Sequence, residues 1–156
     1  MIELNIPGIT NVKIENVVFD MNGTLSENGL IKESVKGLLN ELSKHASIYI
    51  ITSDTFGSAN ESVKGINAKL YIIKGDDSAQ KKKEMVYKLG YSKTVVIGNG
   101  YNDYAMFKQG VIGIGIMESE GLAVKAALHC DIIVTKIENA INLLLNPKKL
   151  AATLRN

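Results

Sequence analysis

The sequence predicts one three-layer α/β domain, in which a mainly parallel sheet is covered by helices on both faces. Short, continuous apolar runs, which are typical of strands buried on both faces, alternate along the chain with segments that carry apolar residues at helical spacing. The gaps between these segments are short, and a length of 156 residues suits a single domain over residues 1–156.

Most of the expected strands are runs rich in Ile and Val. The first two are separated by Pro7-Gly8, which interrupts a strand and allows the flanking segments to pair. The alternation of strands and helices indicates a parallel sheet, in which the crossovers between parallel strands are right-handed. The expected strands are Ile2–Ile6, Thr10–Ile14, Val17–Asp20, Ser47–Ile51, Leu70–Ile73, Thr94–Ile97, Val111–Ile116 and Asp131–Val134.

The expected helices show apolar residues three and four positions apart. In the first, Val35, Leu39 and Leu42 recur at this spacing, and Gly90 provides a stop for the third. The expected helices are Lys32–Lys44, Phe56–Val63, Gln80–Leu89, Asn102–Lys108, Gly121–Leu128 and Ile137–Leu145, followed by a tail.

Composition excludes several classes of protein. Apolar residues make up 46% of the chain and charged residues 22%, and the net charge of +2 is too small to favour nucleic acid or an anionic membrane as a partner. The single cysteine, Cys130, excludes a disulfide framework. The chain starts without a basic, apolar leader pattern and has no run near the roughly 20 apolar residues of a membrane span, so we expect a cytoplasmic protein.

Three polar clusters each follow an apolar run, at the point where a strand is expected to end. Because the carboxyl ends of parallel strands meet at one edge of a sheet, side chains far apart in the sequence would converge there. Each cluster alone fits a common turn, since Asn, Asp and Gly are frequent turn residues. Three in succession indicate a site. The clusters are Asp20-Met21-Asn22-Gly23-Thr24, Thr52-Ser53-Asp54 and Gly98-Asn99-Gly100-Tyr101-Asn102-Asp103.

The order of these clusters resembles the motifs of the haloacid-dehalogenase-like (HAD) superfamily, over about residues 17–134. The first resembles Asp-x-Asp-Gly-Thr, except at Asn22, and the third resembles Gly-Asp-Gly-x-Asn-Asp, except at Asn99. With the later segment Asn-Pro-Lys-Lys-Leu-Ala-Ala-Thr-Leu-Arg, they make the chain similar to the archaeal soluble P-type ATPase-like HAD proteins. The resemblance implies a Rossmann-like HAD core.

The resemblance implies that Asp20 is a nucleophile that forms an aspartyl-phosphate, and that Thr52 donates a hydrogen bond to the phosphoryl group. It also implies Mg²⁺, because a carboxylate that approaches a phosphoryl group needs a cation with oxygen ligands to overcome repulsion. The ligands would be the Asp20 carboxylate, the backbone carbonyl of Asn22, and Asn99 or Asp103. The residues implied to contact phosphate are Gly23, Thr24, Ser53, Lys82 and Asn102.

The identity of the site lysine depends on helix register. In similar sequences the catalytic lysine precedes two core residues of its helix by three and four positions. Met85 and Val86 have that core spacing here, which favours Lys82. Lys81 and Lys83 remain alternatives, because loop lengths vary.

Two departures from the family pattern predict a slow enzyme. Asn22 occupies the catalytic position of the general acid and base but has no titratable proton, as in P-type ATPases, whose aspartyl-phosphate persists. Asn99 offers Mg²⁺ an amide oxygen without formal charge. The carboxylates of Asp54 and Asp103 would partly offset the negative charge that is missing at Asn22 and Asn99, although both residues also suit helix ends. The alternative is a non-catalytic or nearly inactive HAD-like binding or assembly module.

Sequence spacing leaves no room for an inserted cap domain. Only residues 21–51 separate Asp20 from Thr52, and a helix is expected among them. We expect a capless core with an open site, acting on large substrates or closed by a neighbouring subunit. A homo-oligomer formed through Leu25–Ile31 or Leu143–Leu154 is the corresponding hypothesis.

The sequence therefore predicts a hydrolase. Its expected activity is Mg²⁺-dependent phosphoryl transfer through Asp20, with net hydrolysis of a phosphorylated small molecule or nucleotide. Neither nucleic acid nor a membrane is an expected partner, and a general phosphatase and an ATPase both fit the motifs.

Overall fold

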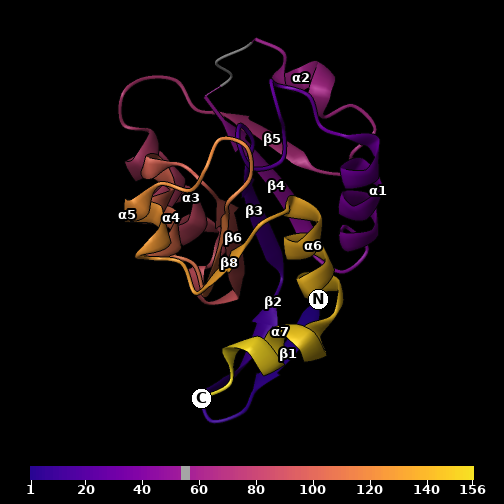
Figure 1. Cartoon of the computed structure of the whole chain (residues 1–156), viewed down its shortest axis with the longest axis vertical. Helices are drawn as coiled ribbons and strands as arrows, with labels where there is room; N and C mark the ends of the chain where they lie inside the picture. The colour runs from indigo at the N-terminus through magenta and orange to yellow at the C-terminus, as the bar shows by residue number, and fades with distance from the viewer. Residues whose placement is uncertain (54–56) are drawn as a thin grey trace.

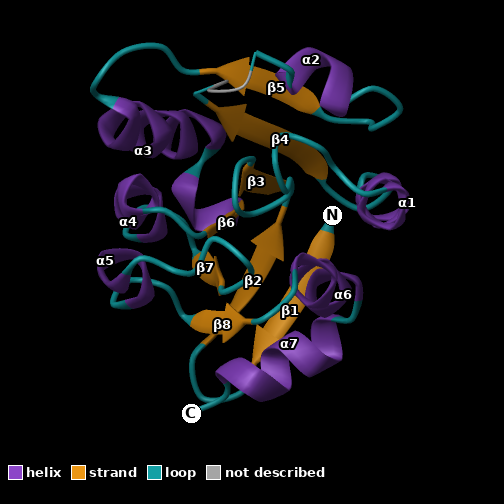
Figure 2. Cartoon of the chain, turned by 45° about the horizontal axis from the view of Figure 1, so that its top comes forward, coloured by secondary structure: helices purple, strands orange, loops and turns teal. Residues whose placement is uncertain are grey.

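A six-stranded parallel sheet organises the chain, and helices cover both of its faces (Figures 1 and 2). The computed structural model describes residues 1–53 and 57–156. The strands are β3 (Asn16–Asp20), β4 (Ser47–Thr52), β5 (Lys69–Ile72), β6 (Thr94–Gly98), β7 (Ile112–Ile116) and β8 (Ile132–Val134). Their order across the sheet is β5-β4-β3-β6-β7-β8, and each neighbouring pair is parallel, which confirms the predicted fold class.

The central strands are buried along their whole length. Every residue of β3, β6 and β7 is buried, whereas the edge strand β5 is largely exposed. This burial explains why the central strands read as continuous apolar runs, because both faces of a parallel sheet are covered.

Two groups of helices form the outer layers. The helices α1 (Glu33–Leu42) and α6 (Ile137–Leu145) contact each other on one face of the sheet (Figure 2). On the other face lie α3 (Ser78–Leu89), α4 (Tyr104–Phe107) and α5 (Val124–Ala127), with α4 in contact with both neighbours. A short helix, α2 (Ala59–Ser62), lies between β4 and β5 in the chain.

Alternating side chains of β3 divide the interior into two cores. Val17 and Phe19 belong to the core under α1 and α6, together with Leu39 and Leu144. Val18, which points the opposite way, belongs to the core under α3, α4 and α5. Because successive side chains of a strand point to opposite faces of the sheet, β3 contributes apolar side chains to the cores under both helical layers.

A small antiparallel hairpin extends the larger core beyond the sheet. Its strands are β1 (Ile2–Ile6) and β2 (Thr10–Ile14), which pair in the predicted way. The last helix, α7 (Pro147–Leu154), packs against β1 (Figure 1). Fully buried Leu150 and the apolar face of the hairpin belong to the same core as Phe19.

Several segments differ from their predicted structure. The segment after Leu145 is the helix α7 rather than a tail, with Pro147 in its first turn and the Asn146 side chain accepting from the Lys149 N–H. The helix expected over Gly121–Leu128 begins at Val124, because Gly121 adopts φ +75° in a turn whose N–H bonds to Glu118. The helix expected over Phe56–Val63 is the shorter α2, and Phe56 lies outside the described residues.

Two short 3₁₀ turns flank β6. They are η1 (Tyr91–Lys93) and η2 (Tyr101–Asp103), and η2 with α4 replaces the single helix expected over Asn102–Lys108. No helix in the described ranges 1–53 and 57–156 has the length and apolar character needed to cross a bilayer.

The chain reverses direction across the sheet at β3. From β3 it proceeds to β4 and β5 on one side, and then returns to β6, β7 and β8 on the other. In open α/β sheets, ligands bind outside the carboxyl ends of the strands at such a switch point. Asp20, Thr52 and Gly98 end three adjacent strands there.

Candidate active site

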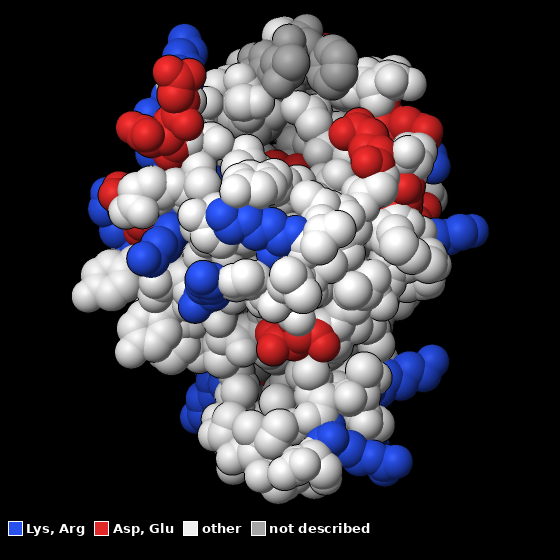
Figure 3. Space-filling view, turned by 60° about the vertical axis from the view of Figure 1, so that its left-hand side comes forward, with Lys and Arg blue, Asp and Glu red and all other residues white. Residues whose placement is uncertain are grey.

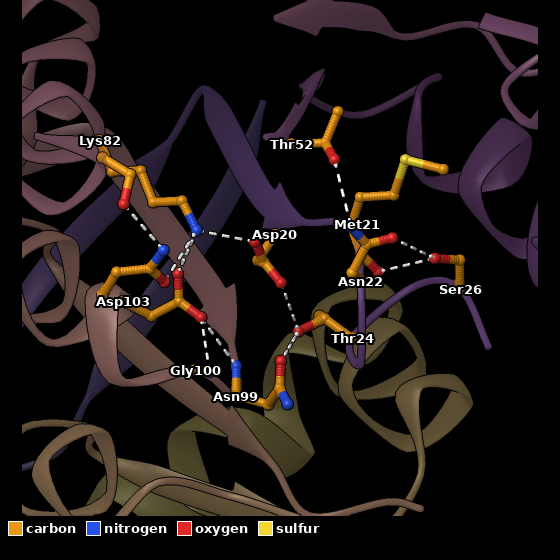
Figure 4. Close-up of polar contacts among 12 residues, drawn as sticks. Asp20, Met21, Asn22, Thr24, Ser26, Thr52, Lys82, Asn99, Gly100 and Asp103 are labelled. Atoms are coloured by element: carbon orange, nitrogen blue, oxygen red, sulfur yellow. Dashed lines mark hydrogen bonds and ion pairs between the residues drawn. The ribbon is translucent and has the colours of Figure 1, made fainter. Parts of the chain in front are cut away.

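A buried lysine lies between two carboxylates at the switch point (Figure 4). The Nζ atom of Lys82, on α3, is 2.7 Å from Asp20 Oδ1 and 2.7 Å from Asp103 Oδ1. Lys82 is 2% exposed, Asp20 8% and Asp103 0%, so these charges meet almost without solvent. Breaking such a buried pair is costly, because the remaining partner keeps an uncompensated charge.

The structure distinguishes the three consecutive lysines. Lys82 points into the site, whereas Lys81 is exposed and donates to the carbonyl of Lys74, and Lys83 is exposed. One helical turn separates Lys82 from buried Val86, so the core face of α3 carries the lysine inward.

Asp103 is oriented by the backbone of the loop after β6. Its Oδ2 accepts from the N–H groups of Asn99 and Gly100, at 3.0 and 2.8 Å. Gly98 permits this close approach, because a Cβ at that position would lie 2.4 Å from Asp103 Oδ2. With both oxygens engaged, Asp103 serves as the fixed partner that positions Lys82.

The second oxygen of Asp20 faces away from Lys82. Thr24 Oγ1 lies 3.3 Å from Asp20 Oδ2 and 3.0 Å from Asn99 Oδ1, so the carboxylate oxygen and the amide oxygen converge on one hydroxyl (Figure 4). Thr24 is 3% exposed, and Asn99 6%. The side of Asp20 opposite the lysine is therefore lined with oxygen atoms.

The turn after Asp20 connects the first cluster to β4. Asn22 Nδ2 donates to Thr52 Oγ1 at 3.4 Å, and Ser26 Oγ donates to Asn22 Oδ1 at 3.3 Å. Gly23 has φ +75°, a conformation that glycine adopts without strain. Ser53 follows Thr52 and is exposed, and the expected contribution of Asp54 lies outside the described residues.

Asn102 joins the lysine to the start of α3. Its Oδ1 accepts from Lys82 at 3.3 Å, and its Nδ2 donates to Ser78 Oγ at 2.9 Å. The structure therefore brings together side chains from all three clusters and α3, while Ser78 and Ser26 are contacts that the sequence reasoning missed.

Burial and neighbouring charges shift the pKa values of Asp20 and Lys82. Desolvation, followed by the neighbouring charge of Asp103, raises the pKa of Asp20 to about 7, against the opposing attraction of Lys82. Burial alone would lower the pKa of Lys82, but Asp20 and Asp103 together raise it above its ordinary value. Lys82 is therefore a fixed positive charge, and Asp20 titrates near neutrality.

The oxygen-lined side of Asp20 has the donor chemistry of a hard cation site. Within the part of the chain that the structure describes, no three His, Cys, Asp or Glu side chains are grouped as metal ligands. The oxygens that do converge are mixed, one from Asp20 and one from the Asn99 amide. Few protein ligands and several retained waters are typical of Mg²⁺, so the residues present fit that ion.

A loop that the sequence reasoning overlooked also reaches the site. Between β7 and α5, the Gly121 carbonyl accepts from Asn99 Nδ2 at 3.1 Å, and the Ala123 N–H donates to the Asn99 carbonyl at 2.9 Å. The Glu120 carboxylate lies against Gly23. This loop could have been predicted to lie near the site from its position in the sequence, because it follows the carboxyl end of another parallel strand, β7.

The face that carries α3, α4 and α5 is open to solvent. Figure 3 shows Lys and Arg side chains over the middle of this face, acidic side chains at its upper left and upper right, and acidic atoms at the bottom of a hollow between them. This face therefore carries both signs of charge around the hollow.

Two short archaeal proteins are related to this chain in sequence. The uncharacterized protein MJ0073 of Methanocaldococcus jannaschii is 42% identical over 64 residues, which are 41% of this chain and 69% of that protein. The uncharacterized protein MJ0072 of the same organism is 46% identical over 39 residues, 25% of this chain and 89% of that protein. No family model matches the chain.

Solved structures similar to the chain have the HAD fold. A 3-deoxy-D-manno-octulosonate 8-phosphate phosphatase from Moraxella catarrhalis, solved with magnesium and phosphate ions, aligns with TM-score 0.66 and 21% identity over 91% of this chain and 94% of that one. A protein described as a HAD superfamily hydrolase from Legionella pneumophila aligns with TM-score 0.71 and 16% identity over 90% and 87%. A phosphoserine phosphatase aligns with TM-score 0.66 and 12% identity over 85% and 99%.

Proposed function

This chain belongs to the same family as MJ0073 of Methanocaldococcus jannaschii, and we propose that it is a HAD-like hydrolase acting on a phosphorylated small molecule or nucleotide. The observation that carries the proposal is the two-sided environment of Asp20. Its Oδ1 contacts buried Lys82, and its Oδ2 faces Thr24 and Asn99 at the switch point of the sheet. The similar solved structures include phosphatases of phosphorylated small molecules, which supports this substrate class.

In the proposed reaction an oxygen of the Asp20 carboxylate attacks phosphorus, and the bond from phosphorus to the substrate oxygen breaks. The electron pair leaves with that oxygen, which takes a proton from water, because Asn22 has none to give. Water then attacks the phosphorus of the aspartyl-phosphate, which releases inorganic phosphate and restores the carboxylate. Lys82 offsets charge on the transferring group, and Thr52 and Ser53 lie at the end of β4 where they would contact its oxygens.

Mg²⁺ would be held by Asp20, Asn99 and the backbone carbonyl of Asn22, and when bound it would supply the positive charge that lets two anions approach. The sequence predicts Asp103 as an alternative metal ligand, but in this proposal it contributes through Lys82, since its two oxygens bond to Lys82 and to backbone N–H groups. Gly23, Thr24 and Asn102 would border the phosphoryl group, although the N–H groups of Gly23 and Thr24 donate to the Ser26 and Met21 carbonyls within the turn.

The absence of a proton donor at position 22 supports slow turnover with a persistent aspartyl-phosphate. That behaviour is the basis for the finer proposal of a soluble P-type ATPase-like enzyme. Asn22 instead bonds to Thr52 and Ser26, so its side chain serves to hold the turn.

Covalent labelling tests the proposal directly. Purified protein is incubated with Mg²⁺ and radiolabelled acetyl phosphate or ATP, and acid-stable label that hydroxylamine removes is measured. We expect label on the wild type and none on Asp20→Asn, while Asp76→Asn, which changes an exposed aspartate, should label like the wild type.

Absence of label with every donor, together with absence of phosphate release from p-nitrophenyl phosphate, would overturn the proposal. That result would favour the alternative, a nearly inactive HAD-like binding or assembly module. Label on Asp20→Asn equal to that on the wild type would show that another residue is modified.

A further inference from the structure

The loop of residues 117–123 holds the Asn99 side chain in one orientation. Asn99 Nδ2 donates to the Gly121 carbonyl at 3.1 Å, and the backbone carbonyl of Asn99 accepts from Ala123 at 2.9 Å. Figure 4 shows the consequence on the other side, where the amide oxygen points toward Thr24 and the nitrogen points away. A flipped amide would turn its oxygen toward another oxygen, at a cost comparable to a lost hydrogen bond.

Glu120 lies close to the same amide. A Cβ built on Gly23 would lie 2.5 Å from Asn99 Nδ2, 2.9 Å from Asn99 Oδ1 and 2.6 Å from Glu120 Oε2, so the amide and the carboxylate crowd one point above the Gly23 backbone. The φ of +75° and this crowding together require glycine at position 23. Three segments far apart in the sequence therefore meet beside Asp20, and one of them brings a carboxylate that has no role in the proposed reaction.

The charges of the side chains around Asp20 indicate what the Glu120 carboxylate could contribute. Asn22 and Asn99 are neutral, and the single positive charge of Lys82 is shared by Asp20 and Asp103. The oxygen-lined side of Asp20 thus has fewer negative groups than a dication prefers. Glu120 is exposed to solvent. Because Mg²⁺ usually keeps several bound waters, a carboxylate here can interact with the ion through one of them.

We propose that Glu120 is a further residue of the divalent-cation site, where it lies beside the Asn99 amide that the Gly121 carbonyl orients and adds the negative charge that Asn22 and Asn99 lack. This inference rests on the proposed function. Outer groups of this kind tune metal affinity by orienting the direct ligands and by adding charge.

Metal affinity, measured without any substrate, tests the inference. Mg²⁺ and Mn²⁺ are titrated into the intact wild type and into Glu120→Gln by calorimetry. We expect binding to Glu120→Gln to be about tenfold weaker, the size typical of such outer contacts. Glu84→Gln, which neutralises an exposed glutamate on α3 bonded to Gln80, should bind like the wild type.

A double substitution separates charge from misfolding. Asn99→Asp alone should gain little, because the new carboxylate faces Glu120 and the Gly121 carbonyl. Asn99→Asp combined with Glu120→Gln should recover most of the lost affinity, since one negative charge is moved rather than removed. The melting temperature in EDTA should be the same for Glu120→Gln and the wild type.

The possible outcomes distinguish the two proposals. If the wild type binds either ion and Glu120→Gln binds equally well, the role of Glu120 is refuted and the proposed function stands. If the wild type binds neither ion and also fails to acquire label, the proposed function itself fails. Weaker binding by Glu120→Gln with recovery in the double variant establishes the inference.

Discussion

Asp20 has two oxygens in different environments, and this asymmetry defines the site at the scale of a single residue. One oxygen pairs with Lys82, and the other meets the hydroxyl of Thr24. A nucleophilic carboxylate beside a phosphoryl group needs a charged partner to hold it in place and a cation to reduce repulsion. The buried lysine is the charged partner, and the oxygen-lined side is where the proposed cation would bind.

The raised pKa of Asp20 predicts a pH-dependent stability for the metal-free protein. Its pKa is raised from 3.8 to about 7, so between these values the folded protein keeps a proton that the unfolded chain has lost. The contribution of Asp20 to stability is therefore fully present below pH 3.8 and is lost as the pH rises through about 7. Urea unfolding in EDTA should show that the stability of the wild type relative to Asp20→Asn decreases between about pH 5 and about pH 8. A difference that is constant or increases with pH would contradict this prediction.

Asn22→Asp should accelerate loss of the phosphoryl group from Asp20. The substitution introduces a group that can give and take a proton, and such groups contribute about 10²- to 10⁴-fold to rates. The measurement is the decay of isolated labelled protein after the donor is removed. Asn22→Ser, which keeps a small polar side chain but adds no acid, is the matched control. Equal decay of the two variants would mean that proton transfer does not limit turnover.

Site residues at strand ends and on helices could be predicted from the sequence, whereas residues brought to the site by the path of a loop could not. Asp20 and Lys82 were predicted to meet, and the structure places them 2.7 Å apart, because strand ends and helix register are visible in the sequence. Glu120 was missed, because it is brought to Gly23 by a turn whose path depends on φ at Gly121. The contact of Asp103 with two backbone N–H groups likewise depends on the loop path.

At the scale of elements, α7 is the part that closes the larger core. Its buried Leu150 packs with the apolar side of the β1–β2 hairpin, and the Asn156 N–H donates to the Pro7 carbonyl at 3.4 Å. The hairpin alone would be marginal, since two strands need a further packing partner to be stable. The helix therefore stabilises the hairpin as well as itself.

Leu150→Ala should strongly destabilise the protein. Leu150 is 0% exposed, and truncation of a buried leucine to alanine costs about 2–5 kcal/mol through lost burial and the remaining cavity. Chemical denaturation measures the loss, and Lys148→Ala, at an exposed position of the same helix, should change stability little. A cost below about 1 kcal/mol for Leu150→Ala would show that α7 is not part of the cooperative core.

The ends of a helix could be predicted from the sequence where its buried residues recur at helical spacing. The helices α1 and α6 carry buried residues at helical spacing over two turns, and both were predicted within a few residues. The short helices α2 and α5 have four residues each, too few for a period to define an end. The helix α7 was missed although Asn146-Pro147 is a typical helix start, because its single fully buried residue gives a weak apolar pattern.

At the scale of the whole molecule, the order of the sheet brings the site together. Because β3 lies between β4 and β6, the three polar clusters at the ends of these strands are adjacent despite their separation in the sequence. The parallel direction of these strands was predictable from their apolar runs. Their spatial order was not, since apolar runs do not specify which neighbours pair.

The proposed homo-oligomer can be tested through the segment Leu25–Ile31. Leu30 is 68% exposed in the turn closed by the Glu27–Leu30 bridge, whereas Leu150, in the alternative segment Leu143–Leu154, is buried within its own chain. We therefore favour Leu25–Ile31 and expect light scattering to give an oligomer for the wild type at micromolar concentration. Leu30→Glu should give a monomer, and Ile9→Glu, a change at an exposed residue of the hairpin turn, should not. A monomeric wild type would refute the hypothesis.

The pairing of α7 with β1 has a consequence for synthesis of the chain on the ribosome. The hairpin emerges first, but the helix that covers its apolar side emerges more than a hundred residues later. Contacts between such distant segments form late and leave apolar surface uncovered in the meantime. The nascent chain should therefore need α7 before the apolar side of the hairpin is covered, even though the residues around Asp20 have all been synthesised by then.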